Sequence, residues 1–206
     1  FPKRREYFLH KHSKYITLSS FCKAGYHGIY TAMIFIVGLG NPGKTYERTR
    51  HNAGFLALDA FIKEHGFQPF KLSSKSKTLV SEGEINSQHV TLAKPQTFMN
   101  KSGVSVRSLL KQGGELIVVH DDIDIPLGTV KVSKDRGSAG HKGVGSVMEE
   151  LKSKDFMRIR IGIQPLAGKP KNVEDFVLQK FSPEELPIVQ SAIQEAAGAI
   201  TKTIEV

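Results

Sequence analysis

The feature that most constrains the fold is a pair of short apolar runs separated by stretches of helical spacing. Residues 34–37 (IFIV) and 116–119 (LIVV) are continuous, uncharged and largely β-branched. Such runs are typical of strands that are buried on both faces of a sheet. Shorter β-rich runs alternate with helical stretches along the rest of the chain. This alternation predicts one α/β domain with a mixed, largely parallel sheet.

The expected elements follow from where the spacing of apolar residues changes. Asn52 is a candidate N-cap and Gly66 a candidate left-handed stop for the first helix, and Asn86 with Ser87 suits a hairpin turn. Strands are expected over residues 33–38, 77–84, 88–94, 116–119, 130–132 and 158–161, and helices over 52–65, 100–113, 141–152 and 183–202. In such sheets, sites form at the carboxyl ends of strands, so we expect chemistry after the first, third and fourth strands.

Length, charge and cysteine content limit the number of domains, the kinds of partner and the compartment that are expected for this chain. The 206 residues predict one domain with an appendage. A net charge of +9 favours a polyanionic partner such as nucleic acid. No stretch approaches the roughly 18 apolar residues of a membrane-spanning helix, so no membrane partner is expected. Cys22 is the one cysteine, which cannot form an internal disulfide and favours a reducing compartment.

Residues 1–32 differ from the rest of the chain. They hold six Lys and Arg residues against one acid, and they sustain neither a helical nor a strand period. We expect this segment to be an extension outside the fold, such as a translated upstream segment or an artefact. A targeting leader and a basic arm that binds RNA are the alternatives. The predicted domain therefore spans residues 33–206.

The first strand is followed by a glycine pattern. Residues 38–43 (GLGNPG) fit the dinucleotide-binding pattern G-x-G-x-x-G, which leaves a nicotinamide-dependent oxidoreductase as one alternative. Pro42, however, disfavours a helical conformation at Asn41, and the next residues have the character of a loop. A tight loop that presents the Asn41 amide is the favoured interpretation.

A histidine and an acidic cluster are the candidates for chemistry. His51 directly precedes a predicted helix, whose positive N-terminal end would keep the imidazole neutral and basic. Residues 120–124 (HDDID) end the fourth strand, and their carboxylates suit either a magnesium site or the orientation of a histidine. A surface histidine and solvated acids are the alternatives. Since no G-x-S-x-G motif is present, a hydrolase of this sequence would use water as its nucleophile.

Five segments in register resemble the bacterial-type peptidyl-tRNA hydrolase family. They are IVGLGNPGKTYERTRHNAGF (36–55), KPQTFMNKSG (94–103), VVHDDIDIPLG (118–128), GSAGHKG (137–143) and FMRIRIGI (156–163). The resemblance implies a single α/β domain with a twisted mixed sheet flanked by helices. It also implies an enzyme that cleaves the ester between a nascent peptide and the 3′ end of tRNA, which releases the tRNA for recycling. Such an enzyme is expected to be a cytoplasmic monomer that needs no cofactor and no metal.

The resemblance also implies roles for individual residues. His51 matches the catalytic base and Asp121 its partner. The implied substrate-binding residues are Asn41, Tyr46, Met99, Asn100, His141 and Lys142. Lys142 departs from the family's usual asparagine, and its ammonium group would bind a phosphate or a carbonyl instead. The candidates for contact with tRNA phosphates are Lys131, Lys134, Arg136, Arg160 and again Lys142. An RNA-binding protein on this fold without hydrolysis is the alternative function.

Overall fold

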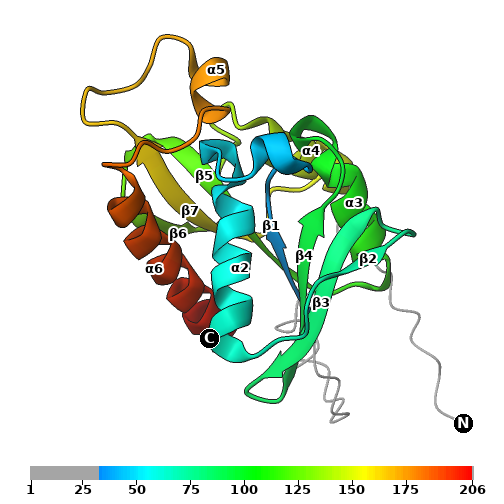
Figure 1. The fold of residues 1–206 in the computed structure, drawn as a ribbon. Helices are drawn as coiled ribbons and strands as arrows, with labels where there is room; N and C mark the ends of the chain where they lie inside the picture. Colours follow the sequence, from blue (N-terminus) through cyan, green and yellow to red (C-terminus); the bar gives the residue numbers. More distant parts are fainter. Residues whose placement is uncertain (1–32, 206) are drawn as a thin grey trace, which may run out of the picture.

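A computed structural model of the chain describes residues 33–205, in which seven strands form one sheet (Figure 1). The strand order is β2-β3-β4-β1-β5-β7-β6. Strands β4, β1, β5 and β7 run parallel to their neighbours within this group, whereas β2, β3 and β6 pair antiparallel at the edges. The strands are β1 (Ile34–Gly38), β2 (Lys71–Ser73), β3 (Thr78–Ile85), β4 (Gln88–Pro95), β5 (Glu115–Pro126), β6 (Val130–Ser133) and β7 (Met157–Gln164). The predicted mixed, largely parallel sheet is confirmed, while the predicted extension over residues 1–32 lies outside the described residues.

Helices cover both faces of the sheet (Figure 1). The α-helices are α2 (Ala53–His65), α3 (Ser102–Leu109), α4 (Lys142–Leu151), α5 (Val173–Val177) and α6 (Leu186–Ile204). Short 3-10 turns are η1 (Lys44–Tyr46), η2 (Arg50–Asn52), η3 (Met99–Lys101) and η4 (Leu110–Gln112). Helices α2 and α6 pack on one face, and α3 and α4 on the other. Over residues 33–205, no helix has the length and apolar character needed to cross a membrane.

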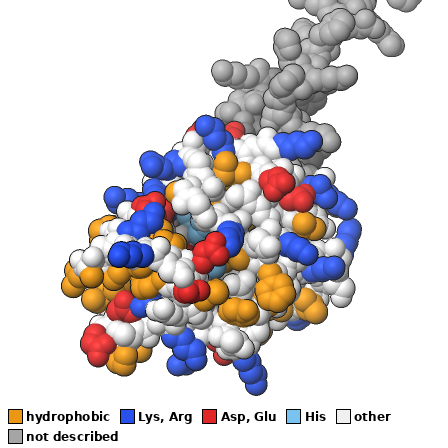
Figure 2. Space-filling view, turned by 90° about the horizontal axis from the view of Figure 1, so that it is seen from above, with side chains coloured by type: hydrophobic (Ala, Val, Ile, Leu, Met, Phe, Trp, Pro, Cys, Tyr) orange, Lys and Arg blue, Asp and Glu red, His pale blue; other side chains and the backbone are white. Residues whose placement is uncertain are grey.

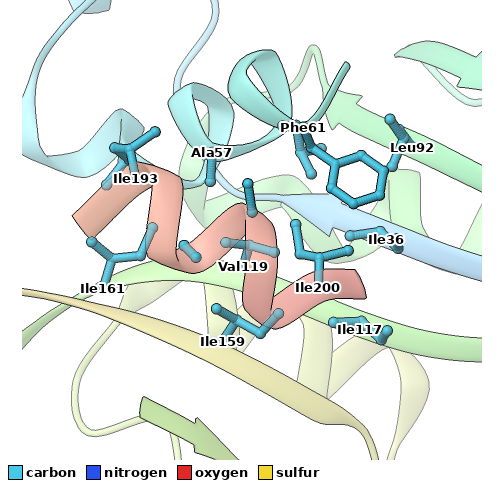
Figure 3. Packing of buried hydrophobic residues seen from close by; sticks show 14 of the residues in the cluster. Ile36, Ala57, Phe61, Leu92, Ile117, Val119, Ile159, Ile161, Ile193 and Ile200 are labelled. Carbon is cyan, nitrogen blue, oxygen red and sulfur yellow. The ribbon is translucent and has the colours of Figure 1, made fainter. Parts of the chain in front are cut away.

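The two faces explain why the strand sequences are continuously apolar. Ile34 and Ile36 of β1 pack in the cluster under α2 and α6, whereas Phe35 and Val37 pack under α3 and α4. Figure 3 shows the first cluster, in which Ile200 of α6 lies over the central strands. Burying an isoleucine side chain contributes about 1.5–3 kcal/mol, so a charge at any of these positions would be strongly destabilising.

The turn residues agree with the predictions. Asn86 and Ser87, which connect β3 to β4, both have positive φ angles of 50° and 63°. Two left-handed residues in a two-residue loop match the right-handed twist of the flanking strands. Gly66, with φ of 66°, ends α2 as predicted.

Two element boundaries differ from the predictions, and two short elements were not predicted. The last helix begins at Leu186 instead of residue 183, because Ser182 and Glu185 first form a reciprocal capping turn. Strand β5 continues to Pro126, so the acidic residues lie within the strand and not after it. The short β2 and α5 were not predicted, since three to five residues carry too little periodicity to indicate an element.

Two glycines bring α2 directly onto the ends of the central strands. A Cβ atom on Gly54 would collide with the backbone oxygen of Val119 in β5 and with the backbone of Leu39. A Cβ on Gly38 would collide with the backbone oxygen of Gly54. This close approach sets the start of α2, and the η2 turn before it, against β5 at Val119.

Candidate active site

A cleft opens where β1, β4 and β5 approach their carboxyl ends, as the sheet topology predicts. Its volume is about 440 Å³. Figure 2 looks down on this end of the molecule, where histidine side chains lie in a hollow between acidic and basic side chains. The predicted site residues that line the cleft are Asn41, His51, Met99, Asn100, Asp121, His141 and Lys142.

His51 and Asp121 form a buried pair in this cleft. His51 Nδ1 lies 2.9 Å from Asp121 Oδ1 and 3.1 Å from Oδ2. Because a carboxylate only accepts, Nδ1 carries the proton and Nε2 keeps its lone pair. Burial lowers the pKa of His51, but the charge and hydrogen bond of Asp121 raise it more, so that it lies above 6.5; the charge of Lys142 opposes this. Burial would raise the pKa of Asp121, but His51 and His141 hold it well below its usual range.

The acidic residues of β5 separate because successive side chains of a strand point to opposite faces. Asp122 accepts from Arg160 Nε at 2.8 Å, and Asp124 pairs with Lys169 at 2.7 Å. Asp121 alone of these three reaches the histidines. Since each carboxylate has a different partner, the arrangement argues against the magnesium site that the sequence left open.

His141 is the second imidazole on Asp121. Its Nε2 lies 3.0 Å from Asp121 Oδ1, and its Nδ1 accepts from the N–H groups of Gly143 and Val144 as the N-cap of α4. Nδ1 therefore holds a lone pair, which assigns the proton to Nε2. The ligand atoms of His51, Asp121 and His141 lie within 4.8 Å of one another. A protonated Nε2 has no lone pair for a metal, so hydrogen bonds account for this cluster better than a metal does.

Asn52 holds the loop that carries Asn41 into the cleft. Asn52 Oδ1 accepts from Asn41 N–H at 2.8 Å, and Asn52 Nδ2 donates to Asn41 O at 3.0 Å. Asn41 Oδ1 in turn accepts from Met99 N–H at 2.9 Å, and Asn41 Nδ2 has no partner within residues 33–205. Asn52 is the N-cap residue of α2, as predicted, but its side chain makes no capping hydrogen bond, because its amide finds both partners on the neighbouring loop.

Arg50 fastens the η2 turn to the far end of the chain. Its guanidinium donates to Lys180 O at 2.7 Å and to Glu185 at 2.6 Å, and it stacks on Phe176 at 4.2 Å. This buried arginine was missed in the sequence. Its partners lie about 130 residues away, and no local pattern indicates them.

The remaining substrate-binding candidates lie at the rim of the cleft or beside it. Asn100 is exposed and follows the buried Met99 in η3. Lys142 is exposed and pairs with Glu174 of α5 at 2.8 Å. Tyr46 is not part of the cleft wall. Its ring contacts the ring of Phe98 edge-on, at a centroid distance of 6.4 Å, and Phe98 does line the cleft.

The predicted phosphate contacts divide into exposed and buried residues. Lys131, Lys134 and Arg136 are exposed on β6 and the loop that follows it toward α4. Arg160 is buried, with its side chain 11% exposed and paired with Asp122. A buried guanidinium offers little surface to a phosphate, so the structure favours a structural role for Arg160. Arg158, which was not predicted, holds the same loop by donating to Gly137 O at 2.8 Å.

The glycine pattern does not lead into a dinucleotide site. Gly43 is followed by η1, a 3-10 turn of three residues, and not by the α-helix whose N-terminus would face a pyrophosphate. Asp59, near the place of a ribose-binding acid, pairs instead with Lys94. The structure therefore argues against the oxidoreductase alternative.

Comparisons with known proteins identify the family of this chain. The sequence matches the model of the peptidyl-tRNA hydrolase family over residues 35–206. A peptidyl-tRNA hydrolase of Syntrophomonas wolfei is 45% identical over 172 residues, covering 82% of this chain and 91% of that protein. One of Carboxydothermus hydrogenoformans is 44% identical over 174 residues, covering 82% and 90%. The solved structure of the Acinetobacter baumannii peptidyl-tRNA hydrolase has a TM-score of 0.75 at 32% identity, covering 82% and 86%.

The family match spans the sheet, its flanking helices and every segment that lines the cleft. The resemblance carried by the five sequence segments is thereby confirmed, together with the single-domain α/β fold. The chain belongs to the peptidyl-tRNA hydrolase family of enzymes.

Proposed function

We propose that the protein hydrolyses the ester between a nascent peptide and the 3′ end of tRNA, with His51 as the base that activates water. One observation carries the proposal: His51 Nδ1 is bound to the buried Asp121 at 2.9 Å in a cleft that His51 itself lines. This bond fixes the tautomer in which Nε2 is the free basic nitrogen.

The proposed reaction proceeds in two steps. His51 Nε2 takes a proton from water while the water oxygen adds to the ester carbonyl carbon, whose π electrons move to the carbonyl oxygen. The carbonyl then re-forms, the bond to the ribose oxygen breaks, and His51 returns the proton to that oxygen. The products are a peptide with a free carboxyl group and a tRNA with a free hydroxyl. Asp121 stabilises the imidazolium between the two steps.

We assign the two asparagines to the substrate. Asn41 Nδ2 has no partner among the described residues, because its Oδ1 is used by Met99, and Asn100 is exposed at the rim. Both amides are therefore able to donate to the peptide backbone or to the tetrahedral oxyanion. An oxyanion donor lowers a barrier by about 3 kcal/mol. Since these amides would grip a second carbonyl, aminoacyl-tRNA without a peptide is expected to react poorly.

The test is release of peptide from purified peptidyl-tRNA. The wild type is expected to release it, and His51→Ala to lose about 10²–10⁴-fold in kcat, the usual contribution of a general base, while retaining tRNA binding. Asp121→Asn is expected to lose about as much, because an amide favours the wrong tautomer. Unchanged hydrolysis by His51→Ala would show that the base is misassigned. Binding without any hydrolysis by the wild type would favour the RNA-binding alternative.

A further inference from the structure

The Asp121 carboxylate is held by two imidazoles through one oxygen. Oδ1 lies 2.9 Å from His51 Nδ1 and 3.0 Å from His141 Nε2, and the Asp121 side chain is 2% exposed. In the proposed function, only His51 handles the proton from water. The second imidazole, that of His141, therefore has no role in the proton transfers of the proposed reaction.

The position of His141 is set by α4 and not by the cleft. Its Nδ1 accepts from the N–H groups of Gly143 and Val144 at 3.1 and 3.2 Å, where an asparagine or serine side chain usually caps a helix. Two donors facing Nδ1 leave Nε2 as the protonated nitrogen, aimed at Asp121. The first turn of α4 thus holds Asp121, in the middle of β5, through a single side chain.

A third histidine supports this arrangement from behind. His120 donates its Nδ1–H to the backbone oxygen of Asp121 at 2.6 Å, and its ring meets the His141 ring edge-on at a centroid distance of 4.8 Å. Burial of the whole ring is the largest cause that lowers the pKa of His120, to about 3. His120 therefore stays neutral at working pH and confines His141 to its place.

We infer that His141 is a positioning residue, whose Nε2–H fixes the Asp121 carboxylate that in turn orients His51. The inference rests on the proposed function of the His51–Asp121 pair. The resemblance implies that His141 contacts the substrate. Here His141 is instead assigned a contact to the Asp121 carboxylate. The hydrogen bond from His141 also stabilises the negative charge of Asp121. It thereby weakens the preference of Asp121 for the protonated form of His51.

The consequence is a pH signature. If the bond from His141 is lost, Asp121 favours the imidazolium of His51 more strongly, which raises the pKa of His51. The acid limb of kcat/KM then moves to higher pH, since the base must be neutral to act. The other charged groups near His51 stay in place, namely Lys142 on α4, its partner Glu174 on α5 and Arg50 in its own turn.

Two substitutions separate the two ends of the ring. In His141→Asn, the amide oxygen stands near the place of Nδ1 and preserves the cap, but the side chain is too short to reach Asp121. In His141→Gln, the amide nitrogen stands near the place of Nε2 and still donates to Asp121, whereas the cap is weakened. His141→Asn thus removes the hydrogen bond to Asp121, whereas His141→Gln removes the hydrogen bonds to the N-terminus of α4.

Opposite outcomes are expected for kinetics and folding. His141→Asn is expected to lose about 10–100-fold in kcat with KM little changed, and to shift the acid limb upward by about half a pH unit or more, while the melting temperature stays near wild type. His141→Gln is expected to recover most of kcat and the wild-type limb, with a melting temperature a few degrees lower. Identical limbs in both variants would overturn the inference.

A second measurement does not depend on activity. Nitrogen-15 NMR of the histidine rings in the free enzyme is expected to show the proton on Nε2 of His141 and on Nδ1 of His51 at neutral pH. A proton on Nδ1 of His141 would overturn the inference whatever the kinetics. Failure of the wild type to hydrolyse peptidyl-tRNA would instead contradict the proposed function. The NMR assignment of the protonated ring nitrogens does not depend on that result.

Discussion

Lys142 and Glu174 face each other at the rim of the cleft, at 2.8 Å, with side chains 56% and 74% exposed. So exposed a pair adds little to stability. The charge of Lys142 nevertheless lowers the pKa of His51, which lies in the wall of the same cleft. Lys142 stands where the family resemblance leads one to expect an asparagine, so this electrostatic influence belongs to the particular sequence of this chain.

We predict that the two rim charges shift the pH profile in opposite directions. In Lys142→Gln, the loss of a positive charge raises the pKa of His51, so the acid limb of kcat/KM moves up by about 0.3–0.5 pH unit. In Glu174→Gln, Lys142 loses its neutralising partner, so the limb moves down. The pH dependence of peptidyl-tRNA hydrolysis at low salt measures both.

The matched control for these charges is Lys134→Gln. Lys134 pairs with Asp155 at 2.9 Å, is about as exposed as Lys142, and does not line the cleft. Its substitution is expected to leave the limb in place. Shifts of the same sign in Lys142→Gln and Glu174→Gln would contradict the electrostatic account.

Among the elements, the contact between α2 and the central strands sets the distance from His51 to Asp121. The η2 turn precedes α2 directly, and Gly54 lets the first turn of α2 touch the backbone of Leu39 and Val119. Arg50 fastens the same turn from the other side through Glu185. His51 is thus held between the sheet and the segment that leads into α6.

We predict that Gly54→Ala impairs both folding and catalysis. The added methyl group meets backbone atoms that cannot rotate away, so the free energy of unfolding is expected to fall by about 1–3 kcal/mol. The displaced η2 turn is expected to lower kcat as well, since small misplacements of a catalytic group are costly. Denaturant unfolding and hydrolysis at saturating substrate measure the two effects.

Gly198→Ala provides the contrast on α6. A Cβ on Gly198 meets nothing within 4 Å, and the residue lies in the interior of a regular helix. Alanine there is expected to stabilise the protein by about 0.5–1 kcal/mol and to leave kcat unchanged. If Gly54→Ala were as well tolerated as Gly198→Ala, the proposed role of the close contact would be wrong.

At the scale of the whole molecule, one question is which residues form the functional domain, and another is which basic residues contact tRNA. The described residues 33–205 contain a sheet with both faces covered, and the family match begins at residue 35. We therefore propose that residues 33–206 form the functional domain. Exposed basic residues at positions 131, 134, 136 and 142 are its candidate phosphate contacts.

We predict that a chain of residues 33–206 keeps the melting temperature and kcat/KM of the full chain. Each phosphate contact contributes about 0.7–0.9 to the slope of log affinity against log salt. Four contacts therefore predict a slope of about −2.8 to −3.6 in both proteins, measured by titration with tRNA. A clearly steeper slope for the full chain would instead assign residues 1–32 to RNA binding.

Much of the fold was predictable because its signals are local. The buried strands, the hairpin at Asn86 and Ser87 and the stop at Gly66 each follow from the spacing or backbone preferences of a few adjacent residues. The short β2 and α5 were missed, because such brief elements depend on the surfaces that they pack against. The extent of β5 was underestimated for the same reason, since its polar end is stabilised by pairing with β7.

The candidate site was predictable in its place and its residue types but not in its connections. The topology of a parallel sheet brings the loops after its strands to one edge, so the sequence predicted where the site forms. The pairing of His51 with Asp121 came from the family resemblance. Only the tertiary structure decided that His141 shares Asp121, that Arg50 fastens the η2 turn to Glu185, and that Arg160 is buried. Local spacing determines strands and helices, whereas these contacts join residues up to 135 positions apart, and only the packed layers bring such partners within hydrogen-bonding distance.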